Sequence, residues 1–252
     1  MVKGWFAAVL AALLFAGTLA AQKQSRAPAK KDLQPDEIIK AFTAKESEFF
    51  DVWTQYYYRQ VATIHVLAVD GEPSKEALTL VFEVVFNDNG TREVKLIERT
   101  GRLTKVLWTA DDEDVITNFQ PFALTSSDLP NYDLKYEGKE KVDELETYVF
   151  SVRPKSTKGE KRFFEGKIWV DDVDLQIVRT TGKVVPQPDP YAQFPEFETL
   201  RQLVDNKYWF PVWSHADSTL TFPKQKVHIE ETITYEGFKR FSSSVVIKPI
   251  KK

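Results

Sequence analysis

The chain has 252 residues and a formal net charge of −3, from 34 basic and 37 acidic side chains that are scattered along it. No segment concentrates the basic charge that would neutralise nucleic-acid phosphates, so nucleic acid is excluded as an expected partner. Cysteine is absent, which excludes disulfides, a cysteine nucleophile, thiolate metal ligands and the lipid-modified cysteine of an anchored lipoprotein.

Residues 1–21 predict a cleaved secretory signal peptide. Lys3 precedes an apolar core over residues 5–15, and small residues follow. This run is shorter than the roughly 20 apolar residues that span a bilayer. We expect cleavage after Ala20 or Ala21, then a flexible polar leader over 22–34. An uncleaved N-terminal anchor is the alternative.

A helix and then many strands are predicted for the mature chain. Pro35 suits the first turn of a helix, and apolar residues recur at helical spacing from there to about residue 51. From Tyr56 onward the apolar period becomes two, as in 78–86 and 147–152, which indicates ten to twelve antiparallel strands. We therefore expect residues 35–252 to form a single, mainly β domain.

Two segments interrupt the alternating pattern. They are 111–130, DDEDVITNFQPFALTSSDLP, and 185–195, VPQPDPYAQFP, and both carry aromatic residues. A long single-layer sheet curls, and one helix with some loop covers its concave side incompletely. The chain has 33 aromatic residues (18 Phe, 9 Tyr and 6 Trp). Most must be core, but an apolar cavity on the concave side is physically feasible.

Three aspartates cluster within FEGKIWVDDVDLQIVRT (164–180), between two apolar runs. Aspartate favours turns because its side chain accepts hydrogen bonds from nearby backbone N–H groups. A calcium loop, the alternative, needs about six or more oxygen ligands and usually a glycine at the bend. We expect a hairpin turn and no metal.

The histidines provide the only candidate catalytic or metal-binding pairs. His215 and Asp217 share one face of a strand, as do His228 and Glu230, so a mixed zinc site or a His–Asp dyad is geometrically feasible. Cross-strand polar pairing explains them as well, and His65 lies on the polar side of its strand. No catalytic or cofactor-binding motif occurs. We therefore expect that the protein is not an enzyme and that it binds no cofactor.

Several segments, in this order, resemble a known superfamily. They are an apolar helix after the signal peptide, NYDLKYEGKEKVDELETYVFSVRPK (131–155), FEGKIWVDDVDLQIVRTTG (164–182), YWFPVWS (208–214) and VHIEETITYEGFKRF (227–241). In these the chain resembles the periplasmic outer-membrane lipoprotein carriers, or lipoprotein-sorting proteins, of the LolA/LolB-like superfamily. It departs from them in an extended region around 185–215.

The resemblance implies an open half-barrel, which is one highly curved antiparallel sheet of about eleven strands. An N-terminal helix and a short helical or loop lid would cover its concave face. It also implies a soluble, monomeric periplasmic carrier that moves an acylated lipoprotein or lipid towards the outer membrane, between an inner-membrane donor and an outer-membrane acceptor. The alternative is a non-enzymatic sensor of the same fold, which recognises a lipid or peptide and signals to a partner protein.

Two groups of apolar residues are predicted to contact the ligand. The lid group is Ile38, Phe42, Phe49, Phe119, Phe122 and Leu124. The cavity wall, taken from inward strand faces, is Phe82, Val84, Phe86, Val106, Trp108, Leu134, Tyr136, Phe150 and Ile168. If Phe42 belongs to the lid, Phe42→Asp should lower lipid retention more than folding stability.

Overall fold

The computed structural model describes residues 33–68, 71–86, 92–188 and 193–241. The predicted signal peptide over 1–21, and the leader up to residue 32, lie outside the described residues. Within the described residues, no helix is both long enough and apolar enough to cross a bilayer.

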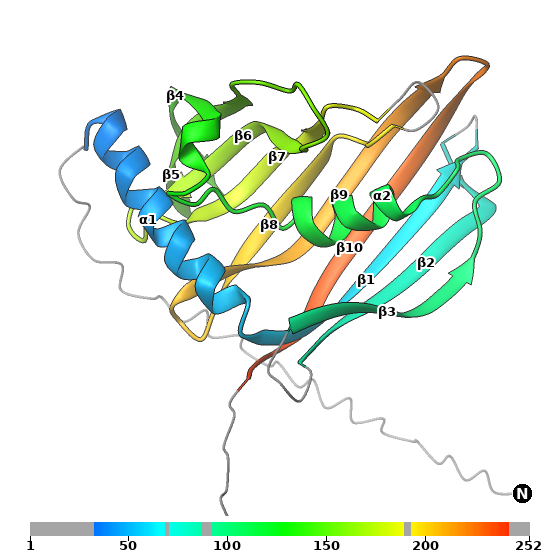
Figure 1. Cartoon of the computed structure of the whole chain (residues 1–252), viewed down its shortest axis with the longest axis horizontal. Coiled ribbons are helices and arrows are strands. Elements are labelled where there is room, and N and C mark those ends of the chain that lie inside the picture. The colour runs from blue at the N-terminus through cyan, green and yellow to red at the C-terminus, as the bar shows by residue number, and fades with distance from the viewer. Residues whose placement is uncertain (1–32, 69–70, 87–91, 189–192, 242–252) are drawn as a thin grey trace, which may run out of the picture.

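Ten antiparallel strands form a single curved sheet in the described part of the chain (Figure 1). Their order is β3-β2-β1-β10-β9-β8-β7-β6-β5-β4, so the sheet stays open, with β3 and β4 as its edges. The predicted fold class is confirmed. The strands are β1 Tyr56–Leu67, β2 Pro73–Phe86, β3 Arg92–Gly101, β4 Tyr132–Val142, β5 Leu145–Pro154, β6 Phe163–Asp171, β7 Ile177–Val185, β8 Phe197–Val204, β9 Tyr208–Phe222 and β10 Gln225–Arg240.

Helix α1, Pro35–Trp53, lies across the concave face of the sheet (Figure 1). It begins where the sequence predicts and ends two residues beyond residue 51. Its first turn is closed by a capping box, in which the Gln34 backbone N–H donates to the Glu37 carboxylate at 3.0 Å. The helix buries Ile38, Phe42 and Phe49 against the sheet, as its apolar spacing indicates.

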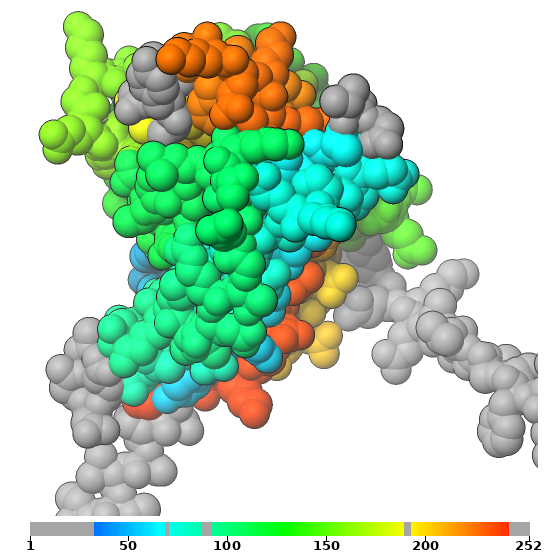
Figure 2. Space-filling view, turned by 90° about the vertical axis from the view of Figure 1, so that its right-hand side faces the viewer, coloured from blue at the N-terminus to red at the C-terminus, as the bar shows by residue number. Residues whose placement is uncertain are grey.

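Two segments form a lid over the concave face of the sheet. Helix α1 is the first part, and the first interruption, 111–130, forms the second. It contains α2 (Ala110–Asp114), the π-helix η1 (Val115–Phe119) and, at its end, the short 3-10 helix η2 (Leu129–Asn131). Figure 1 shows α2 crossing the concave face beside α1. The preceding connection is held to β2, because the Lys105 N–H donates to the Glu76 carboxylate at 2.7 Å. Figure 2 shows this green segment packed against the cyan strands.

The space beneath the helices is filled mainly by the two largest apolar clusters of the described residues. The first packs Ile38 and Phe42 of α1 against strands β4 to β7, including Phe150 and Ile168. The second packs Phe49 and Trp53 of α1, the other end of the same helix, against β1, β2, β9 and β10. One helix therefore contributes to both halves of the core.

A pair of glycines lets one aromatic ring lie flat on the sheet. Gly166 and Gly182 are direct cross-strand partners, and a Cβ on either would meet the Phe164 ring within 2.8 Å and neighbouring backbone more closely still. The Phe164 ring in turn stacks on Phe122 of the lid, with ring centroids 4.3 Å apart. Side chains larger than hydrogen at the glycines would displace this stack.

The three-aspartate segment is a hairpin turn between β6 and β7, as predicted. The Asp171 carboxylate accepts hydrogen bonds from the backbone N–H groups of Val173 (3.0 Å) and Asp174 (2.7 Å). The carboxylate closes the turn by satisfying backbone donors that no strand partner reaches.

Candidate functional site

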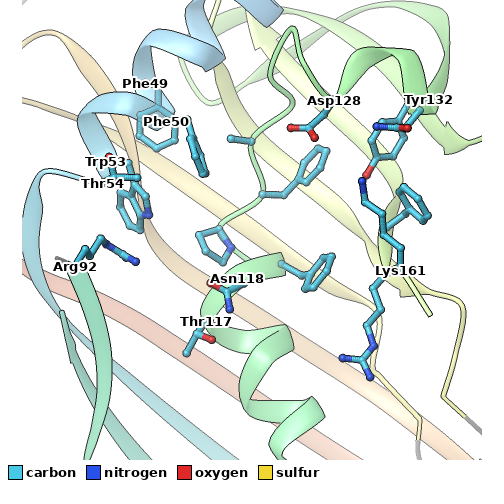
Figure 3. A pocket seen from close by; sticks show the side chains of 17 residues that line it. Phe49, Phe50, Trp53, Thr54, Arg92, Thr117, Asn118, Asp128, Tyr132 and Lys161 are labelled. Carbon is cyan, nitrogen blue, oxygen red and sulfur yellow. The ribbon is translucent and has the colours of Figure 1, made fainter. Parts of the chain in front are cut away.

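A cleft of about 300 Å³ opens between α1 and the η1 segment, over the concave face. Aromatic rings dominate its wall, which Figure 3 shows from close by. The aromatic lining consists of Phe49, Phe50, Trp53, Phe119, Phe122, Tyr132 and Phe163. Thr54, Arg92, Thr117, Asn118, Asp128, Asn131, Lys161 and Arg162 supply the polar groups. The cleft therefore combines aromatic surface with polar and charged side chains, the two kinds of group with which small-molecule sites hold and orient a ligand.

The last turns of α1 form one wall of the cleft. Phe49 points into the core and is 1% exposed, whereas its neighbour Phe50 is 48% exposed. Successive residues of an α-helix point about 100° apart, which explains why one ring is core and the next lies at the mouth. An exposed phenylalanine beside a cleft is an apolar surface available to a ligand.

The opposite wall is formed by η1 and the loop that follows it. The Gln120 N–H donates to the Val115 carbonyl at 3.0 Å, which is the wider i→i+5 winding of a π-helix. Such turns occur mostly as single-turn insertions, frequently at functional sites. Here the turn presents Thr117 and Asn118 to the cleft (Figure 3).

A buried ion pair anchors α1 to the sheet. Arg201 of β8 and Glu46 of α1 are almost fully buried and pair in a fork, with two Nη–Oε distances of 3.1 Å. The Ile177 N–H also donates to Glu46, at 3.0 Å. Burial raises the pKa of Glu46, and the Arg201 charge opposes that rise. Arg201 also donates to the carbonyl of Phe122, so one side chain holds both parts of the lid.

The η1 segment has further polar anchors. Gln60 Nε2 donates to the Ile116 carbonyl at 2.6 Å, and Thr199 Oγ1 donates to the Gln120 carbonyl at 2.8 Å. The Gln120 side-chain amide donates to the carboxylate of Glu231. Burial, its largest cause, raises the pKa of Glu231 to about 7, and the negative charge of Asp112 adds to the rise.

These anchors form a polar seam between the two apolar clusters. We define the polar seam as Glu46, Gln60, Gln120, Thr199, Arg201, Ser214 and Glu231, all of which are buried. It occupies α1, η1 and the central strands, whereas the clusters occupy the two wings of the sheet. In this conformation the polar seam therefore lies between the two largest apolar clusters of the described residues.

The predicted ligand-binding residues are placed in three ways. Phe49, Phe119 and Phe122 line the cleft. Beneath the lid, fully or partly buried in the two clusters, lie Ile38, Phe42, Leu124, Leu134, Tyr136, Phe150, Ile168, Phe82, Val84 and Phe86. Val106 and Trp108 lie between β3 and α2, outside the strands whose inward faces they were expected to share. They line a cavity of only about 10 Å³.

Sequence reasoning missed the polar residues of the cleft. Arg92, Asp128 and Lys161 come from three separate segments, and none belongs to an apolar periodic run. Phe50 could have been identified from the sequence, because it extends the apolar face of α1 beyond the residues that pack on the sheet. Charged residues at strand ends carry no comparable signal in a single sequence.

The histidines lie on the convex face, away from the cleft. On β9, Ser214 and Ala216 point inward and are buried, so His215 between them points outward. Its ring stacks on Trp213, with centroids 5.3 Å apart. His228 pairs with Asp217 across the strands. Among the described residues no group of three His, Asp or Glu side chains is placed to hold a metal ion.

The fold and the cleft together define an open antiparallel half-barrel with a helical lid over an apolar interior. Solved structures similar to this chain include a DUF1329 family protein from Desulfovibrio piger, at 14% identity and TM-score 0.39, covering 83% of this chain and 95% of that one.

Two other similar structures carry the name of the superfamily or of its sorting function. A LolA superfamily protein from Nitrosomonas europaea matches at 11% identity and TM-score 0.36, with 84% and 96% of the two chains covered. A putative outer membrane lipoprotein-sorting protein domain from Vibrio parahaemolyticus matches at 11% identity and TM-score 0.38, with 83% and 93% covered. No known protein family matches the sequence, and no curated protein matches it.

Proposed function

We propose that this chain is a carrier that takes up the acyl chain of a lipid or lipoprotein through the α1–η1 cleft and moves it across the periplasm towards the outer membrane. The observation that best supports this proposal is the cleft itself, whose aromatic walls lead from solvent to an apolar interior. The proposal includes the expected signal peptide over 1–21 and a single carrier domain over 35–252.

A carrier of this kind is needed because an acyl chain is costly to expose to water. Each buried CH₂ group is worth about 0.8 kcal/mol, so a sixteen-carbon chain represents on the order of 12 kcal/mol of transfer free energy. Desorption of such a chain from a bilayer into water is correspondingly slow. A protein that shields the chain in an apolar interior lowers this barrier without a nucleophile, a metal or a cofactor.

The lid must move for a long chain to enter. A volume of about 300 Å³ is at the lower limit for ligand pockets, and the space below it is packed. The rings of Phe42 and Phe150, for example, are both fully buried, with centroids 5.7 Å apart. We infer that the acyl chain takes the place of α1 side chains as the helix lifts away from the sheet.

The anchors of the lid set the energy of this movement. Lifting α1 separates Glu46 from Arg201, and a charge left buried without its partner is strongly unfavourable. Both groups must therefore gain water or new partners as the lid opens. Because Arg201 also holds the Phe122 carbonyl, we expect loss of the ion pair to loosen the η1 loop as well, so that α1 and this loop can separate from each other.

Native mass spectrometry of the protein purified from a periplasm, with organic extraction, tests the proposal. We expect a stoichiometric acylated ligand.

Phe50→Asp should weaken retention of this ligand while changing the free energy of unfolding by no more than about 0.5 kcal/mol, as for other surface substitutions. Phe42 is 0% exposed, so Phe42→Asp should instead lower stability as strongly as retention. The matched control is Val173→Asp, another exposed apolar residue, which lies in the β6–β7 turn and does not line the cleft.

A protein that stays bare after incubation with lipid vesicles and acylated peptide would contradict the carrier function. That result would favour the alternative, a sensor module whose ligand is a protein segment. Loss of ligand in Val173→Asp to the same extent as in Phe50→Asp would show that retention does not depend on the cleft.

A further inference from the structure

Arg92 is a cation at one end of the cleft, and no carboxylate of the described residues neutralises its charge. Its Nη2 donates to the hydroxyl of Tyr58 at 2.9 Å, and its guanidinium lies 5.8 Å from the centre of the Tyr58 ring. The Nε of Arg92 is buried without an acceptor, and among the described residues no acid lies within ion-pair distance of this side chain. Figure 3 shows the guanidinium directed into the cleft beside Trp53.

The partner of Arg92 does not neutralise it. Burial raises the pKa of the Tyr58 hydroxyl to about 12, so this group is uncharged at neutral pH. A guanidinium has five N–H donors in a planar fork that matches carboxylate and phosphate oxygens. The Tyr58 hydroxyl accepts from one of these donors, and it also fixes the position of the others.

The other charged groups of the cleft are engaged or exposed. Arg162 pairs with Asp111 at 2.6 Å and with Asp114 at 3.4 Å, which compensates its charge. Asp128 accepts a hydrogen bond from Thr125 at 2.6 Å. Lys161 is exposed, with its Nζ 5.1 Å from the Phe163 ring centre. Within the described parts of the chain, Arg92 is therefore the one partly buried cation of this cleft that lacks a counter-charge.

We propose that the α1–η1 cleft selects acyl chains that carry an anionic head group, a carboxylate or a phosphate, and that Arg92 binds this group. The inference rests on the proposed lipid-binding function and adds the class of ligand. The alkyl chain lies among the rings of Phe50, Trp53 and Phe119, and the head group lies against the free N–H donors of Arg92. Such charge-assisted, bidentate hydrogen bonds are stronger than those to a neutral hydroxyl.

Binding of three twelve-carbon ligands at neutral pH tests this assignment. Dodecanoate and dodecyl phosphate carry an anion, whereas 1-dodecanol has the same chain with a neutral head. We expect the protein to bind both anions about tenfold or more tightly than the alcohol, a difference of about 1.4 kcal/mol or more. Arg92→Gln should abolish this preference by weakening binding of the two anions far more than that of the alcohol, and Arg92→Lys should restore part of it. Arg153→Gln, an exposed arginine on β5, is the matched control and should have no effect.

The outcomes separate this inference from the function on which it rests. Equal affinity for all three ligands would overturn the head-group assignment and leave lipid binding standing. No binding of any ligand would contradict the proposed function itself. Binding of inorganic phosphate alone, at the concentrations at which dodecyl phosphate binds, would show a free-anion site instead. If Arg92→Gln weakens all three ligands equally and Arg92→Lys restores none, Arg92 acts through its contact with Tyr58 and not through its charge.

Discussion

Glu46 and Glu231 are both buried beneath the lid, but their carboxylates meet different partners. Glu46 receives two N–H groups of a guanidinium and a backbone N–H, so a full positive charge compensates it. Glu231 receives one side-chain amide, from Gln120, and Asp112 adds negative charge nearby. Burial therefore dominates at Glu231 and raises its pKa to about 7, so this carboxyl group titrates near neutral pH.

This difference predicts a pH dependence of stability. The pKa of Glu231 rises from 4.5 to about 7 on folding. Between pH 4.5 and pH 7 the folded state therefore holds a proton that the unfolded chain releases. The stabilisation is complete below pH 4.5 and is lost as pH rises to about 7, by roughly 3 kcal/mol at 1.36 kcal/mol per pKa unit. Urea unfolding across this range should show the loss.

Glu231→Gln isolates the contribution of this group. The amide cannot ionise, so the stability difference between the variant and the original protein should grow in favour of the variant as pH rises towards 7. Asp112 remains titratable in both proteins, and burial raises its pKa too. A stability difference that stays constant with pH would show that Glu231 does not titrate in this window.

The lid elements depend on contacts with chain segments far away in sequence. Glu46 and Arg201 are 155 residues apart, and Ser47 of α1 accepts a hydrogen bond from the Ser126 backbone N–H at 3.0 Å. Neither α1 nor the η1 segment is held to the sheet by neighbours along the chain alone. Movement of either segment therefore requires the loss of these polar contacts together with the apolar packing beneath it.

A reversible cross-link between the two parts of the lid tests this movement. Thr43 Oγ1 and Ser126 Oγ lie 3.5 Å apart, and the chain has no cysteine of its own. With Cβ atoms brought to the roughly 3.8 Å of a disulfide, Thr43→Cys/Ser126→Cys should close on oxidation. We expect the oxidised variant to lose uptake of an acyl ligand and the reduced one to regain it.

Each single cysteine variant controls for the substitutions, and mass spectrometry with thiol labelling confirms closure. Unchanged uptake by the fully oxidised double variant would mean that ligand enters without separation of α1 from the loop at Ser126. The proposed opening movement would then be wrong, although binding in the cleft would stand.

The molecule as a whole is one continuous sheet whose two apolar clusters share α1. Ile38 and Phe42 belong to the first cluster, and Phe49 and Trp53 to the second. The polar seam between the clusters is itself paired through Arg201 and Gln120. A local loss of packing in one wing therefore destabilises the helix that the other wing requires.

We accordingly expect residues 35–252 to unfold as a single cooperative unit. Far-ultraviolet circular dichroism and tryptophan fluorescence should give coincident transitions in urea, which is the usual test of two-state behaviour. The probes are well distributed, since Trp53 reports on α1 and Trp169 on β6. Two separated transitions would show that the wings unfold independently and that the domain prediction is wrong.

The sequence by itself determined the secondary structure and the fold class. The period-two pattern at 78–86 and 147–152 lies within β2 and β5, the helix predicted from residue 35 begins there, and the three-aspartate segment is a turn. The aperiodic segment 111–130 is the second part of the lid. These features depend on residues close together in the chain, so periodicity and turn chemistry are enough to find them.

Only the tertiary structure decided which residues meet. Phe42, predicted for the lid, is fully buried on the inner face of α1, whereas Phe50 of the same helix lies at the mouth of the cleft. Glu46 and Arg201 form a buried pair, and Arg92 lines the cleft opposite segments from the middle of the chain. Such contacts follow from the curvature of the sheet and from the distance at which α1 packs on it. These depend on packing among strands far apart in sequence, which no local pattern encodes.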